Sequence, residues 1–523
     1  MAALVRSPAG NLALVTALAA GVGLGGPFAL VTIAAIGLIA FAIGVSRPMA
    51  VVALAVFTSL LPWPPGLEPG VGVLGGTLYV ADLLIGLSAL LVMTGAGAGP
   101  VGPPESRSAG PLGRGSARGT PVGLAAGVVG IGIFGAVVAA NAPGAFLRDV
   151  RGPLYLLAGV TVGMAATTRP RLRLTLVRSV CAAMWVSAAG VLVTIATGLP
   201  IVGGKIGEVS TNLSGVYTAF DAVRFRIAPT QVALMVLTVV LAFAMVRPPG
   251  VDVGALAVAF APPCLVLTFL SFSRSALVAL ALTVVICAMS SLRWSHLISF
   301  SGRGFAVIVV AVLGGLVLIT AGDLMAGAAG NGGNPVRSQV EAYQARVLDV
   351  LGSDKLNQDA SASFRRRESG LAVTAIHGQP LAGAGFGAVY RLPMTFEPFA
   401  EQSGVTYVHN YYLWIAIKTG LVGLALTLAL LALPILRWLL WLRADPRARV
   451  AVPFMACVGG VIGVLYVEPV AQARQSAAVF GGLVGVAWAL TARPEGTSDS
   501  RLPRKATWPE PASSAGEPTV ASV

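Results

Sequence analysis

The chain has 523 residues, of which 56% are hydrophobic and 11% are charged. This balance excludes a soluble globular domain, and apolar runs without a period of two exclude a transmembrane barrel, so the sequence predicts an all-α integral membrane protein. The formal net charge is +14, but the arginines lie mostly in short connections between apolar runs. In such places they set membrane orientation, and we exclude a nucleic-acid partner.

Long apolar runs recur along the chain, and a helix needs about 20 apolar residues to cross the hydrocarbon core of a bilayer. We therefore expect a polytopic bundle of about 12 to 14 transmembrane helices. The N-terminal run lacks a cleavage site of small residues, so we expect it to stay as a span. The expected spans are residues 11–25, 28–46, 49–64, 78–94, 121–141, 146–166, 175–197, 227–246, 254–271, 273–291, 304–322, 421–442, 451–468 and 475–492.

Connections rich in arginine set the expected orientation, because such connections stay on the cytoplasmic side of the membrane. Residues 95–120 are one such connection, and they are also rich in Gly, Pro and Ser. The others are residues 169–173, the connection at Arg247, and residues 293–303 and 437–449. With these inside, both termini are cytoplasmic. The segments expected outside are residues 198–226, 271–275 and 323–408.

The chain divides into six expected parts. They are N-terminal transmembrane helices at 1–94, a flexible cytoplasmic loop at 95–120, central transmembrane helices at 121–322, a large extracytoplasmic loop of short helices at 323–408, C-terminal transmembrane helices at 409–492, and a disordered cytoplasmic tail at 493–523. Within the large loop we expect helices at 335–352 and 363–376, with a Gly-rich turn at 379–387. After the loop, Gly420 and Gly423 are expected to break a short helix from the long helix that follows.

The four cysteines all lie inside apolar runs of the sequence. They show no CxxC spacing and have no histidines near them, so disulfide bonds and metal ligation are not expected. We expect small buried hydrophobic side chains at these positions, and the sequence predicts neither a metal nor a cofactor. The cysteines are Cys181, Cys264, Cys287 and Cys457.

Several arginines fall on the expected outer side, where the positive-inside rule does not explain them. A charge at membrane depth is costly and usually faces a bundle interior or a cavity. A guanidinium group binds phosphate oxygens through two parallel hydrogen bonds, so the group suggests a lipid-linked diphosphate. As an alternative, Arg224 and Arg226 extend to lipid headgroups and Arg148 pairs with the adjacent Asp149. The arginines are Arg148, Arg151, Arg224, Arg226 and Arg274.

His409 lies where the large polar loop ends and apolar sequence resumes. Asn410, Tyr411 and Tyr412 follow it, and aromatic rings of this kind favour the membrane–water interface. Its position suggests a functional histidine beside the arginines; a purely structural hydrogen-bonding role is the alternative. Glu468, at the outer end of an expected span, is a possible carboxylate partner.

The other two histidines are expected to be inert. His377 lies in a polar loop and is expected to face solvent, and His296 is expected on the cytoplasmic side.

Four stretches of sequence carry a family resemblance. They are Ser273-Arg274-Ser275-Ala276-Leu277, Gln379-Pro-Leu-Ala-Gly-Ala-Gly-Phe-Gly387, His409-Asn-Tyr-Tyr-Leu413 and Thr419-Gly-Leu-Val-Gly-Leu424. Together with Arg226, Pro229 and Thr230, their order and placement resemble the O-antigen ligase / O-antigen polymerase superfamily of bacterial envelope enzymes. The resemblance covers roughly residues 120–490. Gln379 departs from the family pattern, which leaves the contacts of that loop open.

The resemblance implies a glycosyltransferase of the bacterial inner (cytoplasmic) membrane, with its active site on the extracytoplasmic face. Such an enzyme passes a glycan from a polyprenyl-diphosphate carrier to an acceptor hydroxyl on a glycan, lipid or protein. The reaction would be metal-independent and inverting.

By the same resemblance, His409 would be the general base and Arg274 would hold the diphosphate. Weaker candidates for the diphosphate are Arg148, Arg151, Arg224 and Arg226. Residues expected to contact the acceptor or the loop are Asn410, Tyr411 and Tyr412.

Two other classes of function stay open. A transporter or flippase of lipid-linked sugars would also need an arginine-lined route, but it should carry charge at the midplane of several helices, and these spans are nearly free of charge. A transporter of a small anion such as bicarbonate should show paired broken helices at the midplane, whereas the break expected here, at Gly420, lies near the surface. A structural scaffold would not need an outward basic cluster. Ligase and polymerase differ in the acceptor site, which no short motif here specifies.

Overall fold

The computed structural model describes residues 48–63, 68–73, 76–94, 115–197, 202, 205–213, 216–248, 251–291, 335–348, 360–392, 405–444, 446–468 and 470–492. The spans expected at 11–25, 28–46 and 304–322 lie outside these residues, as do the tail from 493 and most of the loop at 95–120.

Helices make up most of the described residues. They are α3 (Pro48–Leu60), α4 (Val80–Met93), α5 (Gly115–Val138), α6 (Pro143–Thr168), α7 (Pro170–Thr197), α8 (Ala228–Val246), α9 (Val253–Leu270), α10 (Arg274–Ser291), α12 (Pro335–Tyr343), α14 (Ala360–Gly378), α15 (Tyr411–Ala444), α16 (Val452–Val464) and α17 (Arg474–Thr491). Among the described residues, five helices are long and apolar enough to cross a membrane. The predicted class, an all-α integral membrane protein, is confirmed.

The expected spans agree with the observed helices to within a few residues wherever the structure describes them. α5 begins at Gly115, inside the segment expected as a loop, and α16 ends at Val464, before the expected end at 468. Beyond Val464 the backbone continues as a hydrogen-bonded turn, in which the amide of Glu468 donates to the carbonyl of Val464 at 2.8 Å. In the large loop, α14 covers the expected helix at 363–376, and α12 with the π-helix Gln344–Leu348 covers most of 335–352.

Two antiparallel hairpins were not predicted. β1 (Gly70–Val73) pairs with β2 (Gly76–Tyr79), and β3 (Lys205–Leu213) pairs with β4 (Val216–Arg226). The second hairpin lies within the polar segment 198–226. Its sequence signal is the Ser-Gly dipeptide that separates two runs rich in β-branched and aromatic residues.

Helices α6 and α17 pack closely through glycines. A side chain at Gly159 or Gly163 of α6 would meet the backbone of Ala478 or Gly482 in α17, and one at Gly481 would meet the backbone of Leu156. Small residues four apart let two transmembrane helices approach at backbone distance. This close contact sets the position of α17 along α6, and with it the position of Arg474 at the start of α17.

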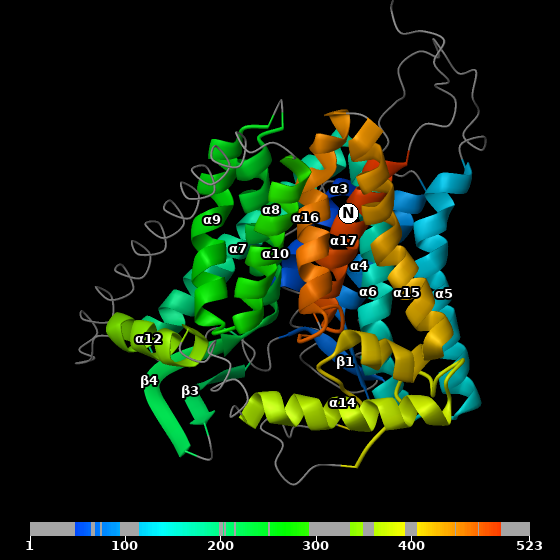
Figure 1. Ribbon diagram of the computed structural model, residues 1–523, viewed down its shortest axis with the longest axis horizontal. Coiled ribbons are helices and arrows are strands. Elements are labelled where there is room, and N and C mark those ends of the chain that lie inside the picture. The colour runs from blue at the N-terminus through cyan, green and yellow to red at the C-terminus, as the bar shows by residue number, and fades with distance from the viewer. Residues whose placement is uncertain are drawn as a thin grey trace, which may run out of the picture.

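Helix α14 lies across one end of the bundle, which we call the capped end (Figure 1). The hairpins and α12 gather at the same end (Figure 1). α6 begins there, because Phe146 lies against Gly387 of the Gly-rich turn. With 26 residues and about 1.5 Å of rise per residue, α6 carries the chain to the opposite end. The turn between α6 and α7 therefore lies at the other end of the bundle.

The Gly-rich turn docks against a break in α15. Gly420 has φ 67° and ψ −172°, which interrupts the helix, as the sequence predicted. The amides of Leu421 and Val422 therefore donate to Pro380 and Leu381 instead of to the preceding turn of their own helix. The helix carbonyls that they leave, at residues 417 and 418, accept from the amides of residues 384 and 385, at 2.8 and 3.0 Å. The two helical hydrogen bonds that the amides of Leu421 and Val422 give up are thus replaced on both sides, as low-dielectric surroundings require.

A buried ion pair holds the same turn to the bundle. Lys418 Nζ lies 2.8 Å from Asp149 Oδ2, and the lysine is fully buried. Nζ also donates to the carbonyl of Ala388 at 2.7 Å, and the amide of Gly387 donates to Asp149 at 2.8 Å. Each charge is therefore both paired and hydrogen-bonded, which is the condition for burying it.

Candidate functional site

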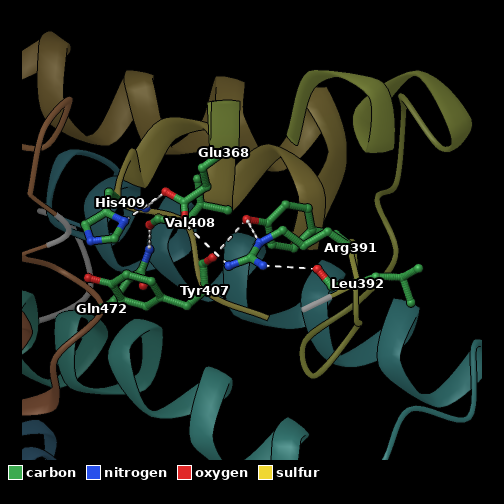
Figure 2. A network of polar contacts seen from close by, with 8 residues as sticks. Glu368, Arg391, Leu392, Tyr407, Val408, His409 and Gln472 are labelled. Atoms are coloured by element: carbon green, nitrogen blue, oxygen red, sulfur yellow. Dashed lines mark hydrogen bonds and ion pairs between the residues drawn. The ribbon is translucent and has the colours of Figure 1, made fainter. Parts of the chain in front are cut away.

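His409 lies just before α15, at the capped end. Its ring Nδ1 is 2.9 Å from Glu368 Oε2, and its backbone N–H donates to the same oxygen at 2.8 Å. Figure 2 shows the ring joined to Glu368 through one nitrogen, with the second nitrogen pointing away. One carboxylate oxygen therefore sets both the backbone and the ring of this histidine.

Glu368 lies on the inward face of α14. Phe364, Ala372 and Ile376 share that face at helical spacing, and Glu368 is only 1% exposed. Arg391 approaches the other carboxylate oxygen at 3.9 Å. A buried carboxylate is costly unless it is paired and hydrogen-bonded, and here a guanidinium group and the histidine supply these partners.

Arg391 is held in place by its own surroundings. Its Nε donates to Tyr390 Oη and its Nη1 donates to the carbonyl of Leu392, both at 3.1 Å. The Tyr390 hydroxyl in turn donates to the carbonyl of Tyr407 at 3.0 Å. The segment after the Gly-rich turn is therefore tied to the segment that carries His409 (Figure 2).

Aromatic rings and a glutamine hold His409 from the other sides. The rings of Tyr407 and Phe364 meet the imidazole edge-on, with centroids 5.0 and 6.1 Å away. Gln472 donates to the carbonyl of Val408 at 3.0 Å. The imidazole therefore has a single defined orientation.

The residues after His409 build the start of α15. Asn410 Oδ1 accepts from the amides of Tyr412 and Leu413 at 3.0 and 3.2 Å, as a helix N-cap does. Tyr412 donates to the carbonyl of Ile462 at 2.7 Å, and Tyr411 is 1% exposed. These contacts orient the helix; the acceptor contacts expected for Asn410, Tyr411 and Tyr412 stay predictions.

Arg274 opens α10 between two serines that bind one carboxylate. Ser273 donates to Glu468 Oε2 at 3.0 Å, and Ser275 bonds the same oxygen. Gln231 donates to the other oxygen at 3.1 Å. Arg274 Nε donates to the backbone carbonyl of residue 346 at 2.9 Å. Glu468, expected as a carboxylate partner, thus fixes the turn that presents the arginine.

The remaining arginines of the expected site take different places. Arg224 donates to the carbonyl of Ser271 at 2.8 Å, so it lies beside the turn of Arg274. In the backbone register of the second hairpin, Arg226 at the end of β4 lies opposite Lys205 at the start of β3. Arg148 donates to Thr406 at 3.2 Å, near the segment of His409.

Arg151 belongs to a cluster of its own. Its Nε lies 3.3 Å from Asp82, and its guanidinium lies 5.1 Å from the ring of Tyr79. Arg474 stacks on the same ring at 3.9 Å and pairs with Glu68. Sequence reasoning missed Arg474, although it opens an expected span on the outer side, as Arg148 and Arg151 do.

The turn between α16 and α17 connects these groups. Glu468 binds the serines beside Arg274, Gln472 binds the segment of His409, and Arg474 opens α17. The amide of Tyr411 donates to the carbonyl of Leu465 at 2.9 Å. His409 and the arginine turn therefore lie at the same end of the bundle. Within the described ranges, no group of three or more His, Cys, Asp or Glu side chains could hold a metal ion.

One family model matches part of the chain. Residues 256–428 match the family model for O-antigen ligase, a narrower range than the expected 120–490. No curated protein and no solved structure matches the chain. The matched range contains Arg274, Glu368 and His409, and the predicted resemblance is confirmed.

Proposed function

We propose, from the match of residues 256–428 to the O-antigen ligase family model, that the protein transfers a glycan from a polyprenyl-diphosphate carrier to an acceptor hydroxyl. The observation that carries the proposal is His409, oriented by a buried glutamate at the bundle end where Arg274 and Arg224 also lie. The family match itself supports a membrane enzyme that acts on glycans.

The proposed reaction is a single displacement at the anomeric carbon. The acceptor hydroxyl gives its proton to His409 as its oxygen bonds to the anomeric carbon. The bond from that carbon to the diphosphate oxygen breaks, and the polyprenyl diphosphate leaves with the electron pair. One displacement inverts the configuration of the carbon. Neither a metal nor another cofactor has a role in this scheme.

Arg274 is proposed to stabilise the charge that develops on the leaving diphosphate. Preorganised donors are effective because they do not reorganise during the reaction, and the two serines that bind Glu468 fix this turn. Arg224, Arg226 and Arg148 are secondary candidates. Arg151 is a weaker one, since Asp82 already compensates its charge.

We further propose that the capped end faces the extracytoplasmic side of a bacterial inner membrane, with both termini in the cytoplasm. The donor would then enter from the bilayer. The acceptor would be a glycan, a lipid or a protein, and its identity decides between a ligase and a polymerase.

The test is His409→Ala in cells that make the native glycan. We expect a loss of transfer of about 10²- to 10⁴-fold, the usual effect of removing a general base, with accumulation of the polyprenyl-linked glycan. His377→Ala is the matched control, because His377 is exposed at the end of α14. Unchanged transfer by an inserted His409→Ala protein would refute the proposal. Accumulation on the cytoplasmic leaflet would instead indicate a transporter of lipid-linked sugars.

A further inference from the structure

We propose that Glu368 is a positioning residue that selects the proton-accepting nitrogen of His409, a role that rests on the proposed function of that histidine. Glu368 Oε2 lies 2.9 Å from Nδ1. An ionised carboxylate accepts hydrogen bonds only, so Nδ1 must carry the proton. In a neutral imidazole the other nitrogen, Nε2, is then the basic one.

The backbone contact makes this choice rigid. The same oxygen accepts the N–H of His409 at 2.8 Å, so the carboxylate is fixed relative to the main chain that carries the ring. The neighbouring rings of Tyr407 and Phe364 restrict rotation of the imidazole. A flip that exchanged the two nitrogens would break the contact with Glu368.

The charge of Glu368 has a second consequence during transfer. When Nε2 takes the acceptor proton, the ring becomes a cation, and the adjacent carboxylate stabilises it. Arg391, at 3.9 Å from the other oxygen, supplies a second partner to this carboxylate, which is 1% exposed. Glu368 therefore contributes both orientation and charge, without touching the substrate.

The placement of Glu368 on α14 argues for this role over an incidental one. Its neighbours Arg366 and Arg367 are exposed, whereas Glu368 lies among the apolar residues of the inward face. An alanine or leucine would fill that position without the cost of burying a charge. The contacts with His409 and Arg391 therefore account for an acid at this buried position.

Nitrogen spectroscopy tests the choice of tautomer without any substrate. The chain has only three histidines, so ¹⁵N-histidine labelling gives three ring systems, and His409→Ala assigns one of them. In lipid bilayers, at a pH where the ring is neutral, we expect His409 to carry its proton on Nδ1. In Glu368→Gln the single form should give way to a mixture, because an amide can donate as well as accept. A proton on Nε2 in the unaltered protein would overturn the proposal.

Transfer activity tests the functional part. Glu368→Gln should lower transfer by at least about tenfold, up to the full 10²- to 10⁴-fold loss of the base. In the His409→Ala background the same change should cause no further loss, because the two residues act as a unit. Glu341→Gln is the matched control, since Glu341 is exposed on α12. Full activity of Glu368→Gln would contradict the role.

The two measurements separate this inference from the proposed function. A Nδ1–H tautomer combined with full transfer by His409→Ala would leave the pairing intact and refute the base. The reverse result, a loss of transfer without the Nδ1–H tautomer, would keep the base and refute the positioning by Glu368.

Discussion

Arg274 depends on the shape of its side chain as well as on its charge. Its Nε donates to the carbonyl of residue 346 at 2.9 Å, which ties the start of α10 to the π-helix after α12. A guanidinium group can make this bond and still present a planar fork, whereas an ammonium group is a point charge with no Nε. The geometry therefore specifies arginine.

Arg274→Lys should lower transfer by about 10²-fold, the loss typical of removing one preorganised donor. The measurement is transfer from polyprenyl-linked donor in isolated membranes. Arg173→Lys is the matched control, because Arg173 is exposed near the start of α7, at the opposite end of the bundle. Equal activities for the two variants would show that charge alone suffices at position 274.

At the residue scale, the sequence was sufficient to single out His409 and Arg274 as candidates but not their partners. His409 is prominent because it stands where polar sequence meets an apolar run. Glu368 follows three arginines in the sequence, so the stretch has the composition of a solvated helix face. Its burial depends on how α14 packs on the bundle, a tertiary contact that no local pattern encodes.

At the scale of elements, α15 is two helices joined by an exchange of hydrogen bonds with the Gly-rich turn. The left-handed φ of Gly420 is accessible to glycine at no steric cost. A β-carbon there would also meet the carbonyl of Leu381. The break frees the backbone groups that bind the Gly-rich turn, and the turn supplies the hydrogen bonds that the helix loses at the break.

Gly420→Ala should destabilise the protein by about 1–3 kcal/mol or more, from backbone strain and from the clash with Leu381. The readout is the midpoint of thermal unfolding in detergent, followed by tryptophan fluorescence. Gly370→Ala is the control, because Gly370 lies within α14 and a β-carbon there meets nothing within 4 Å. That control should keep or raise the midpoint, since alanine favours a helix by about 1 kcal/mol. The prediction fails if both variants unfold alike.

Helices were predictable from sequence where apolar runs are long, and so was the break at Gly420. The hairpin of β1 and β2 was not, because its strands have four residues each and leave little periodic signal. The longer hairpin of β3 and β4 does carry a turn signal, but it was missed within a segment that was read only as polar. The pairing of α6 with α17 was also beyond reach. Its glycines are visible in the sequence, but α5 and α16 are equally rich in glycine, so composition does not say which two helices pair.

At the scale of the whole molecule, the capped end and the turn at residues 169–173 lie at opposite ends of the bundle. The positive-inside rule predicts that the arginine-rich turn is cytoplasmic and the capped end is outside. This orientation is the condition under which the proposed chemistry meets a donor in the outer leaflet.

Cysteine labelling tests the orientation. In a variant without the four native cysteines, His377→Cys should react with a membrane-impermeant maleimide in intact cells, because position 377 is exposed at the capped end. Arg173→Cys should react only after the membrane is permeabilised. Labelling in the reverse order would place the capped end in the cytoplasm and refute the proposed location of transfer.

The ion pair between Asp149 and Lys418 has a consequence for biogenesis. About half of the chain separates the two residues, so the carboxylate of α6 enters the translocon long before its counter-ion leaves the ribosome. Until α15 is inserted, that carboxylate lacks the lysine that pairs with it in the folded protein, and the carbonyl of Ala388 lacks its donor. Closure of the pair is therefore a late step of membrane insertion. A chain that stops before residue 418 would leave the carboxylate of Asp149 without its buried cation.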